Sequence, residues 1–407
     1  MGSGGLDAST LALLPDTILD ELRRDGLDPL ARSSGPVTRV PLPIGMSAWL
    51  VTGDQEVRQV LAAPVGTFSN DIGTLAHVPS ALRRQALGGL GVSDPPIHEQ
   101  LRQLIAPDFT MRSLRRLEPR IRTIVAEQLD HVAALPQPVD LVSAFAWPVP
   151  ARVICELLGV PEHRREEFQR LSSERFDLVA GMDALFGAIS TSLDCLQDMI
   201  ADQRQAPQDG LLGTLVSRGG ALDDRTLAGL ADGVLIGGLE TSASMIALGT
   251  LVLLRDPSLH RRATGGDLDA VVEELLRHLT VVQTAFPRYA LQDTDIGGHR
   301  VARGDAVLCS LLRANRDPAP IRNASGNRQH LAFGHGIHHC LGAELARMEL
   351  RIAYAELLKR FPRMRLAVSE GQTRFHRLSI VYGLEQLPVF LDAPQGRTRP
   401  AGRPDSE

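Results

Sequence analysis

The segment from Asp223 to Leu254 constrains the fold of this 407-residue chain more than any other. It is the longest stretch with a helical pattern, and it is apolar almost all round. Asp223 and Asp224 stand at its start, where carboxylates suit the helix dipole, and Asp256-Pro257 closes it. A helix without a polar face is buried on all sides, so this one should run through the interior of the protein.

The rest of the chain carries mostly helical patterns with a few short strand patterns, and no composition shift marks an internal boundary. We therefore predict a mainly α protein with small β-sheets, folded as one domain over residues 1–407, with a loosely ordered lead-in at 1–35 and a disordered tail at 394–407. The expected helices are Met111–Ala134, Glu162–Val179, Ala184–Gln205, Asp267–Leu279 and a segment from Cys340 to about Phe361, the second and third as surface helices. The expected strands are Val37–Val40, Trp49–Thr52, pieces of Val281–Cys309, Leu378–Val381 and Leu387–Leu391.

Charge and hydropathy exclude several classes of protein. The formal net charge is −5, which gives no reason to expect nucleic acid or an anionic membrane as a partner. No basic and apolar signal sequence opens the chain, and the best candidate for a membrane span, Val234–Leu254, is interrupted by Glu240. We expect a cytoplasmic protein that is not bound to a membrane.

One of the four cysteines differs from the others. Cys155, Cys195 and Cys309 lie in helix-like or strand-like segments and are predicted to be small core residues. Cys340 follows the glycine-rich run Phe333-Gly334-His335-Gly336-Ile337-His338-His339 and precedes Leu341-Gly342. Glycines permit tight turns there, and a helix start after the cysteine would favour a thiolate. Two alternatives are a buried core cysteine and a zinc site, although ligands crowded on one short turn rarely close a tetrahedron.

This run resembles the haem-binding loop of the cytochrome P450 family, which has the pattern FxxGxxxCxG. The resemblance extends from about Trp49 to Val389. It implies the P450 fold, with haem b held between the long distal helix and the helix after the cysteine loop, and with Cys340 as the iron ligand. The loop residues Phe333, Gly334, His338 and Gly342 would then also contact the cofactor.

A second motif, Gly237-Gly238-Leu239-Glu240-Thr241-Ser242, lies midway along the long helix. Glycines let a ligand approach the backbone, and a hydroxyl beside a carboxylate can relay protons. The resemblance implies that O₂ binds opposite Cys340, that Gly237 and Gly238 make room for it, and that Glu240 and Thr241 deliver protons. Taken alone, such a threonine usually bonds back to a carbonyl one turn earlier.

Further motifs imply structural and cofactor-binding roles. Glu274 and Arg277 resemble the family's Glu-x-x-Arg motif, which implies a buried structural ion pair. His98 and Arg102, in a DPPxHxxxR-like segment, together with Arg288 and His338, are predicted to bind the haem propionates, because cations and imidazoles suit carboxylates.

One segment departs from the family pattern. Ala319–Gln329 is shorter than the meander usual in relatives, which normally supplies an arginine or histidine to the Glu-x-x-Arg pair. Arg322 or Arg328 could take that place.

These motifs predict a monooxygenase that uses O₂ and NAD(P)H-derived electrons from a separate ferredoxin and ferredoxin reductase. Arg112, Arg115 and Arg116 could meet an acidic ferredoxin, or could form an ordinary solvated helix face. We expect a monomer acting on a small molecule. Oxidative coupling, ring closure or desaturation is the alternative outcome, and a haem-binding sensor without turnover is the alternative of another class.

The expected substrate is a medium-sized, mostly apolar natural product that is hydroxylated or epoxidised. By analogy with the family, its pocket should be lined mainly by apolar side chains from four segments of the chain. The predicted pocket residues are Thr74, Val234, Gly238, Val282, Thr284, Ala285 and Ile380.

Overall fold

The computed structural model describes residues 35–41, 47–71, 89–174, 182–220, 222–317, 329–369, 372–376 and 381–391. The predicted lead-in, apart from residue 35, and the predicted tail at 394–407 lie outside these ranges.

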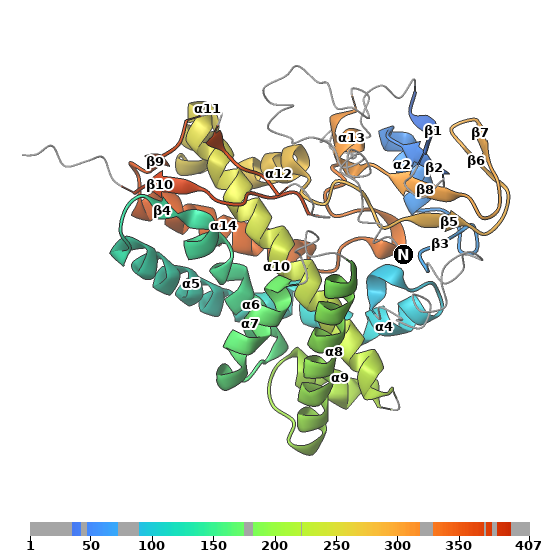
Figure 1. The fold of residues 1–407 in the computed structure, drawn as a ribbon, viewed down its shortest axis with the longest axis horizontal. Helices are drawn as coiled ribbons and strands as arrows, with labels where there is room; N and C mark the ends of the chain where they lie inside the picture. The colour runs from blue at the N-terminus through green and yellow to red at the C-terminus, as the bar shows by residue number, and fades with distance from the viewer. Residues whose placement is uncertain are drawn as a thin grey trace, which may run out of the picture.

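The long apolar segment forms helix α10, Asp224–Arg255, which crosses the middle of the protein (Figure 1). The side chain of Asp223 accepts a hydrogen bond from the Thr226 N–H and so caps its first turn. By length and composition α10 could cross a membrane, but 78% of its most apolar window is buried inside the protein. It is packed against helices α6, α8 and α14, so its apolar surface serves as the core of the fold, as its sequence predicts.

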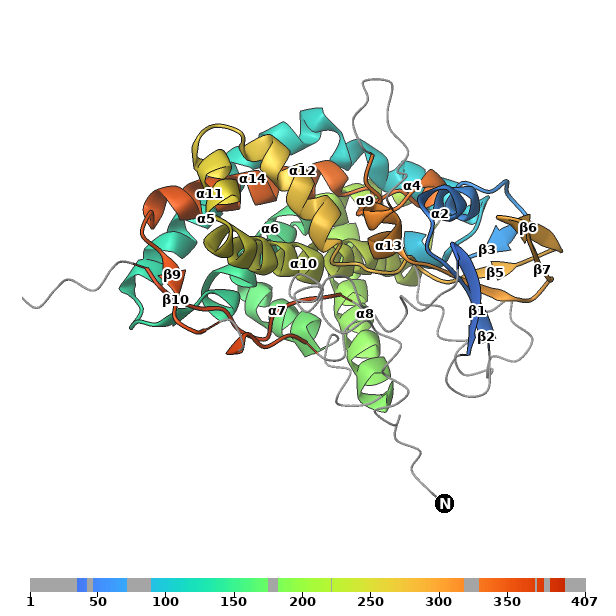
Figure 2. The ribbon, with the colours of Figure 1, turned by 90° about the horizontal axis from the view of Figure 1, so that it is seen from above.

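Other helices surround α10 (Figures 1 and 2). The predicted helix Met111–Ala134 is confirmed with the same bounds, and its apolar stripe is buried. The predicted helix from residue 162 is a short turn, Glu162–Arg164, followed by α7, and its end beyond Glu174 lies outside the described residues. The helices are α2 (Asp54–Leu61), α4 (Ile97–Ile105), α5 (Met111–Ala134), α6 (Pro148–Leu158), α7 (Arg165–Glu174), α8 (Met182–Gln205), α9 (Leu211–Gly219), α11 (Pro257–Thr264), α12 (Leu268–Leu279), α13 (Leu311–Arg316) and α14 (Ala343–Arg360). Short helical turns are η4 (Leu90–Val92), η5 (Ala106–Phe109), η6 (Val142–Ala146) and η9 (Gly336–His338).

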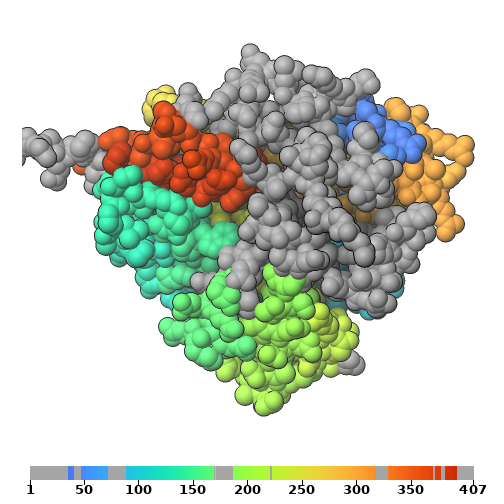
Figure 3. Space-filling model, viewed as in Figure 1, coloured from blue at the N-terminus to red at the C-terminus, as the bar shows by residue number. Residues whose placement is uncertain are grey.

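Helix α8 is a surface helix with one buried face. Its residues Leu193, Leu196 and Ile200 are buried, and the helix packs on α10. Its outer side forms part of the green lower region of the surface in Figure 3. The sequence prediction of a surface helix is therefore correct for α8.

Small sheets complete the fold, and the largest has the strand order β1-β2-β8-β5-β3. Strands β2 and β8 pair in parallel, with Val51 opposite Cys309, although 258 positions separate them in the sequence. The strand predicted at Leu387–Leu391 is confirmed as β10, whereas three of the four residues of Leu378–Val381 lie outside the described ranges. The strands are β1 (Val37–Pro41), β2 (Ser47–Val51), β3 (Phe68–Ser69), β4 (Val139–Asp140), β5 (Arg288–Ala290), β6 (Thr294–Ile296), β7 (His299–Val301), β8 (Ala306–Cys309), β9 (Arg365–Leu366) and β10 (Pro388–Phe390).

Helix α14 crosses α10 at a close contact. The hydroxyl of Tyr354, which is fully buried, donates a hydrogen bond to the Met245 carbonyl of α10. Gly249 makes room for this contact, since a Cβ there would stand 1.9 Å from the Tyr354 hydroxyl. The absence of one side chain on α10 thus allows a polar contact between the two helices.

Replacing Gly249 by alanine should therefore destabilise the protein by about 1–3 kcal/mol through overpacking. Gly187, in α8, is the matched control, because it is exposed and a Cβ there meets nothing within 4 Å. Ala is the better helix former, so Gly187→Ala should stabilise by up to about 1 kcal/mol. Urea unfolding at unchanged m-value measures both, and a Gly249→Ala variant as stable as the wild type would contradict the packing argument.

Candidate active site

A cavity of about 1610 Å³ lies between α10 and the loop that contains Cys340. Its wall combines α10, the turn η4, the helix α4, the segment that leads into β5, and the cysteine loop. The sequence-predicted residues that line it are His98, Arg102, Val234, Gly237, Gly238, Thr241, Val282, Thr284, Ala285, Arg288, Phe333, Gly334, His338, Cys340 and Gly342. The fold thus brings most of the predicted site together from distant parts of the chain.

Two predicted pocket residues, Thr74 and Ile380, lie outside the described residues. Glu240 is 4% exposed and buried in α10, one residue before Thr241, which lines the cavity.

The cysteine loop is a tight hairpin closed by a backbone hydrogen bond of 2.9 Å from the Cys340 N–H to the Phe333 carbonyl. Gly334 and Gly336 both have φ of +72°, which glycine adopts without strain. At Gly336 a Cβ would also stand 2.1 Å from the Leu61 carbonyl of α2. The glycines of the motif are therefore explained by backbone conformation and by close packing on α2.

Cys340 is accessible from the cavity, whereas Cys155, Cys195 and Cys309 are buried, as predicted. Burial within the protein raises the pKa of the Cys340 thiol, against the opposing effects of a Gly342 N–H and the Arg102 charge. Helix α14 begins only at Ala343, so the thiol precedes the helix rather than opening it. A metal ion would reverse this pKa shift, because a coordinating thiol is deprotonated.

The zinc alternative finds no support in the described part of the chain. No group of three or more His, Cys, Asp or Glu side chains in the described ranges could hold a metal ion, although His335, His338, His339 and Cys340 are all among them. Crowding in sequence does not make these side chains converge in space.

Unpaired nitrogen atoms gather at one edge of the cavity. The rings of His98 and His338 lie 4.2 Å apart, and among the described residues no partner bonds either His98 nitrogen or His338 Nδ1. Burial, with the charges of Arg288 and His98, lowers the pKa of His338 to about 4. Arg288 is 5% exposed, and its guanidinium donates to the Phe286 carbonyl at 2.9 Å.

A buried cation such as Arg288 and unpaired imidazole nitrogens cost free energy of folding. A ligand that offers negatively charged hydrogen-bond acceptors at this edge would remove that cost. A group that carries carboxylates and a metal would meet this need, with the carboxylates at the histidine and arginine edge and the metal at Cys340. Haem has this composition.

The opposite wall is the middle of α10. A Cβ placed at Gly237 would meet no atom within 4 Å, so the lack of a side chain leaves open space there. A Cβ at Gly238, in contrast, would stand 2.3 Å from Ile154 Cδ1 of α6. Gly238 is therefore also a packing residue. The Thr241 hydroxyl donates to the Gly237 carbonyl at 2.5 Å, the bond back to the previous turn that an isolated threonine usually makes.

The predicted ion pair between Glu274 and Arg277 is wrong. Glu274 is 42% exposed and pairs with Arg262 at 2.8 Å, and Arg277 instead donates to the Asn315 carbonyl at 3.2 Å. Successive helical residues point about 100° apart, so the preceding residue, Glu273, faces the cysteine loop in place of Glu274.

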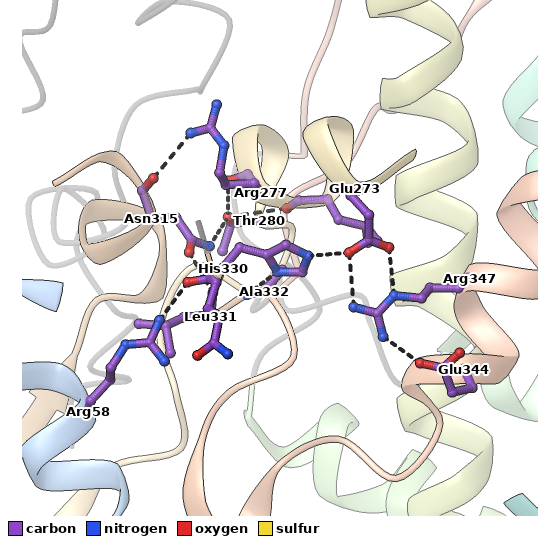
Figure 4. A network of polar contacts seen from close by, with 12 residues as sticks. Arg58, Glu273, Arg277, Thr280, Asn315, His330, Leu331, Ala332, Glu344 and Arg347 are labelled. Carbon is purple, nitrogen blue, oxygen red and sulfur yellow. Dashed lines mark hydrogen bonds and ion pairs between the residues drawn. The ribbon is translucent and has the colours of Figure 1, made fainter. Parts of the chain in front are cut away.

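Glu273 is the centre of a polar network that anchors the loop (Figure 4). It accepts hydrogen bonds from Arg347 of α14 at 2.6 Å and from His330 at 3.0 Å. The Arg347 guanidinium also lies 4.7 Å from the centre of the Phe333 ring. Burial alone would raise the pKa of Glu273, but the bonds from His330 and Arg347 outweigh it and lower the pKa to about 2.

Asn315 extends the network on the other side of the loop (Figure 4). Its side-chain oxygen accepts from the Leu331 N–H at 2.6 Å, and its Nδ2 donates to the Thr280 hydroxyl at 2.8 Å. Arg58 of α2 donates to the Gln329 carbonyl at 2.6 Å. These bonds hold the segment before Phe333 from α2, α12 and α13. Arg322 and Arg328, considered for this role from the sequence, lie outside the described residues.

The sequence reasoning missed several polar residues of the site. Glu273 stands next to the glutamate that the Glu-x-x-Arg motif names, and no sequence pattern gave His330 a role. Glu349 also lines the cavity. It follows Leu345 by four residues and precedes Ile352 by three, so it lies on the apolar face of its helix. A carboxyl on an apolar face is the signal that could have identified it. Other polar lining residues that the sequence did not predict are Thr373, Arg374, His376 and Glu385.

Comparison with known proteins identifies the family. The family model for cytochrome P450 matches residues 268–381. Cytochrome P450 165B3 of Amycolatopsis orientalis is 36% identical over 390 residues, which cover 90% of this chain and 97% of that protein. Mycinamicin IV hydroxylase/epoxidase of Micromonospora griseorubida is 38% identical over 367 residues, covering 87% of this chain and 92% of that one. The solved structure of P450 StaH from glycopeptide antibiotic A47934 biosynthesis matches with a TM-score of 0.79 at 39% identity, covering 88% and 95% of the two chains.

The chain belongs to the cytochrome P450 family and has its fold. It is an oxidoreductase, a P450 monooxygenase of the bacterial secondary-metabolism type, and the family uses haem and O₂. The relatives therefore disfavour the alternative of a haem-binding sensor.

The network predicts opposite effects for two adjacent glutamates. Glu273→Ala leaves Arg347 and His330 without their carboxylate and should destabilise the haem-loaded protein by about 1–3 kcal/mol. Glu274→Ala removes an exposed pair with Arg262 and should change the stability by no more than about 0.5 kcal/mol. Denaturant unfolding measures the free energy of unfolding of both variants. A larger decrease in Glu274→Ala than in Glu273→Ala would support the ion pair predicted from the sequence.

Proposed function

We propose that the cavity holds haem b with Cys340 as the ligand of its iron. The observation that carries this proposal is the set of side chains that line one cavity. A thiol stands at its wall, and its edge holds a buried arginine and imidazole nitrogens that have no partner among the described residues. Neither a core cysteine nor a zinc site accounts for these groups together.

Bound haem would supply the redox-active iron at which O₂ is reduced and substrate is oxidised. The protein's own residues hold it and exclude water. His98, Arg102, Arg288 and His338 offer donors to the propionates, and Phe333, Gly334 and Gly342 form the loop around the thiolate.

On the α10 side Gly237 leaves open space, and the hydroxyl of Thr241 is at the cavity wall. Glu240 precedes it as a buried carboxyl. We propose that these two residues move protons toward the cavity. Thr241 would have to exchange its bond to the Gly237 carbonyl for one to a ligand, which its hydroxyl can do by rotating about the Cβ–Oγ bond.

The substrate that we propose is a medium-sized, mostly apolar natural product. Val234, Val282 and Ala285 supply apolar wall, and Thr284 supplies a polar contact. Hydroxylation or epoxidation is the first candidate, in line with the relative named mycinamicin IV hydroxylase/epoxidase. Oxidative coupling or ring closure is the second, because the matching structure of P450 StaH comes from the biosynthesis of a glycopeptide antibiotic. Mass spectrometry of the products distinguishes them, since insertion adds one oxygen atom and coupling removes two hydrogens.

The electrons would come from NAD(P)H through a separate ferredoxin and its reductase. Arg112, Arg115 and Arg116 are exposed on α5, which packs against α14, the helix that follows Cys340. This basic surface fits an acidic ferredoxin. The same proposal includes a cytoplasmic, monomeric protein in which one P450 domain spans residues 1–407.

The iron ligand is tested by spectroscopy of the dithionite-reduced protein under carbon monoxide. We expect the strongly red-shifted Soret band of a thiolate complex in the wild type and its loss in Cys340→Ala. Cys195→Ala, at a buried cysteine outside the cavity, should keep the band. A band of an ordinary carbonyl haem in the wild type would refute Cys340 as the ligand.

A further inference from the structure

Thr280 adopts a backbone conformation that its side chain disfavours. It follows the last turn of α12 with a φ of 40°, and it is 1% exposed. Apart from glycines, no other residue in the described ranges has a positive φ. Glycine is the usual residue at such a helix end, and a β-branched residue is strained there. Strain of this kind persists where the surrounding structure enforces it, and it is concentrated at functional sites.

The Thr280 hydroxyl has two partners that glycine could not have (Figure 4). It donates to the Arg277 carbonyl at 2.8 Å, one of the carbonyls that the end of a helix leaves without a helical partner. It accepts from Asn315 Nδ2 of α13 at 2.8 Å. Asn315 is 2% exposed, and its Oδ1 accepts from the Leu331 N–H at 2.6 Å, which fixes the orientation of the amide. Asn315 therefore joins the end of α12 to the segment before the cysteine loop.

The residues that follow Thr280 form one wall of the cavity, and all of residues 281–286 line it. This wall is also attached to α13, because the Gln283 carbonyl accepts from the Leu311 N–H at 2.8 Å. Leu311 is the first residue of α13, and Asn315 is the last but one. The short helix α13 thus holds the wall at one end, and at its other end it holds both Thr280 and the segment that leads to Cys340.

We propose that Thr280 and Asn315 are positioning residues that set the distance between the wall 281–286 and the cysteine loop. The strained φ turns the chain from α12 into the wall, and the two hydrogen bonds of the Thr280 hydroxyl enforce it. Neither residue lines the cavity, so both act through the wall, on the size of the ligand that fits opposite Cys340. The place of that ligand rests on the proposed function, whereas the contacts themselves do not.

Two probes of different size test this role in the haem-loaded protein. Imidazole and 4-phenylimidazole both bind haem iron through a nitrogen atom, but only the second carries a ring that competes with the wall for space. Titrations followed by the shift of the Soret band give the ratio of their dissociation constants. That ratio should change several-fold in Thr280→Val and in Thr280→Gly, because both lack the hydroxyl. It should keep the wild-type value in Thr280→Ser, which retains the hydroxyl.

Urea unfolding of the same variants separates positioning from stability. Glycine adopts a positive φ without strain, so Thr280→Gly should be more stable than Thr280→Val, although both change the ratio of the dissociation constants. If the ratio instead follows stability, so that it changes in Thr280→Val and stays at the wild-type value in Thr280→Gly, the residue is merely structural and the proposal is wrong. A wild-type ratio in both variants would also overturn it.

Thr250→Val is the matched control. Thr250 is also 1% exposed, but its hydroxyl donates to the Ile246 carbonyl of its own helix at 2.7 Å, and it does not line the cavity. This variant should keep the wild-type ratio. Asn315→Asp tests the other partner, because a carboxylate still accepts from the Leu331 N–H but cannot donate to the Thr280 hydroxyl. Its ratio should change in the same direction as that of Thr280→Gly, and an unchanged ratio would contradict the role of Asn315.

Hydrogen exchange of backbone amides needs no iron ligand, so it tests the positioning role even if the proposed function fails. The amides of Leu311 and Leu331 should exchange several-fold faster in Thr280→Gly, and at the wild-type rate in Thr250→Val. A wild type without the red-shifted carbonyl band, but with this difference in exchange, would refute thiolate ligation by Cys340 and leave the positioning role intact. Unchanged exchange in Thr280→Gly would refute the positioning role itself.

Discussion

The hydrogen bond from the Cys340 N–H to the Phe333 carbonyl closes the loop on which the cavity depends. It holds the thiol at the wall of the cavity, and the two glycines with positive φ make the turn possible. Polar contacts from neighbouring helices add to the packing of Phe333 and Leu341 on the core and anchor this loop. Glu273, Arg347 and Asn315 provide that anchorage from helices on either side.

Burial of the polar groups around the cavity shifts their pKa values. The same burial raises the pKa of the Cys340 thiol and lowers that of His338. Each group is thereby held in its neutral form, and Arg288 is buried nearby. A ligand that brings a metal cation to the thiol and carboxylates to the basic edge reverses both effects. Such a cofactor would therefore offer acceptors to nitrogen atoms that have no partner in the described part of the chain.

The sequence allowed much of the site to be predicted, and the failures have a common cause. The cysteine loop, the Gly237–Thr241 segment of α10 and the group His98, Arg102 and Arg288 each have a recognisable sequence pattern. Residues from all three line the cavity. The Glu274 prediction failed because a motif does not state which of two adjacent carboxylates faces inward. Glu273 is chosen by the phase of α12 against the loop, which depends on packing with α13 and α14. Gly238 likewise has a packing partner, Ile154, from a distant helix.

The sequence by itself determined those features of this protein that depend only on residues close together in the chain. A helix apolar all round had to be central, a glycine-rich loop had to turn tightly before Cys340, and the motifs resemble those of the cytochrome P450 family. Only the tertiary structure decided which polar groups meet. Contacts such as Tyr354 with Met245, or Glu273 with His330, join segments 109 and 57 residues apart. Helical periodicity gives the face on which a side chain lies, but the partner on that face is set by how separate helices pack.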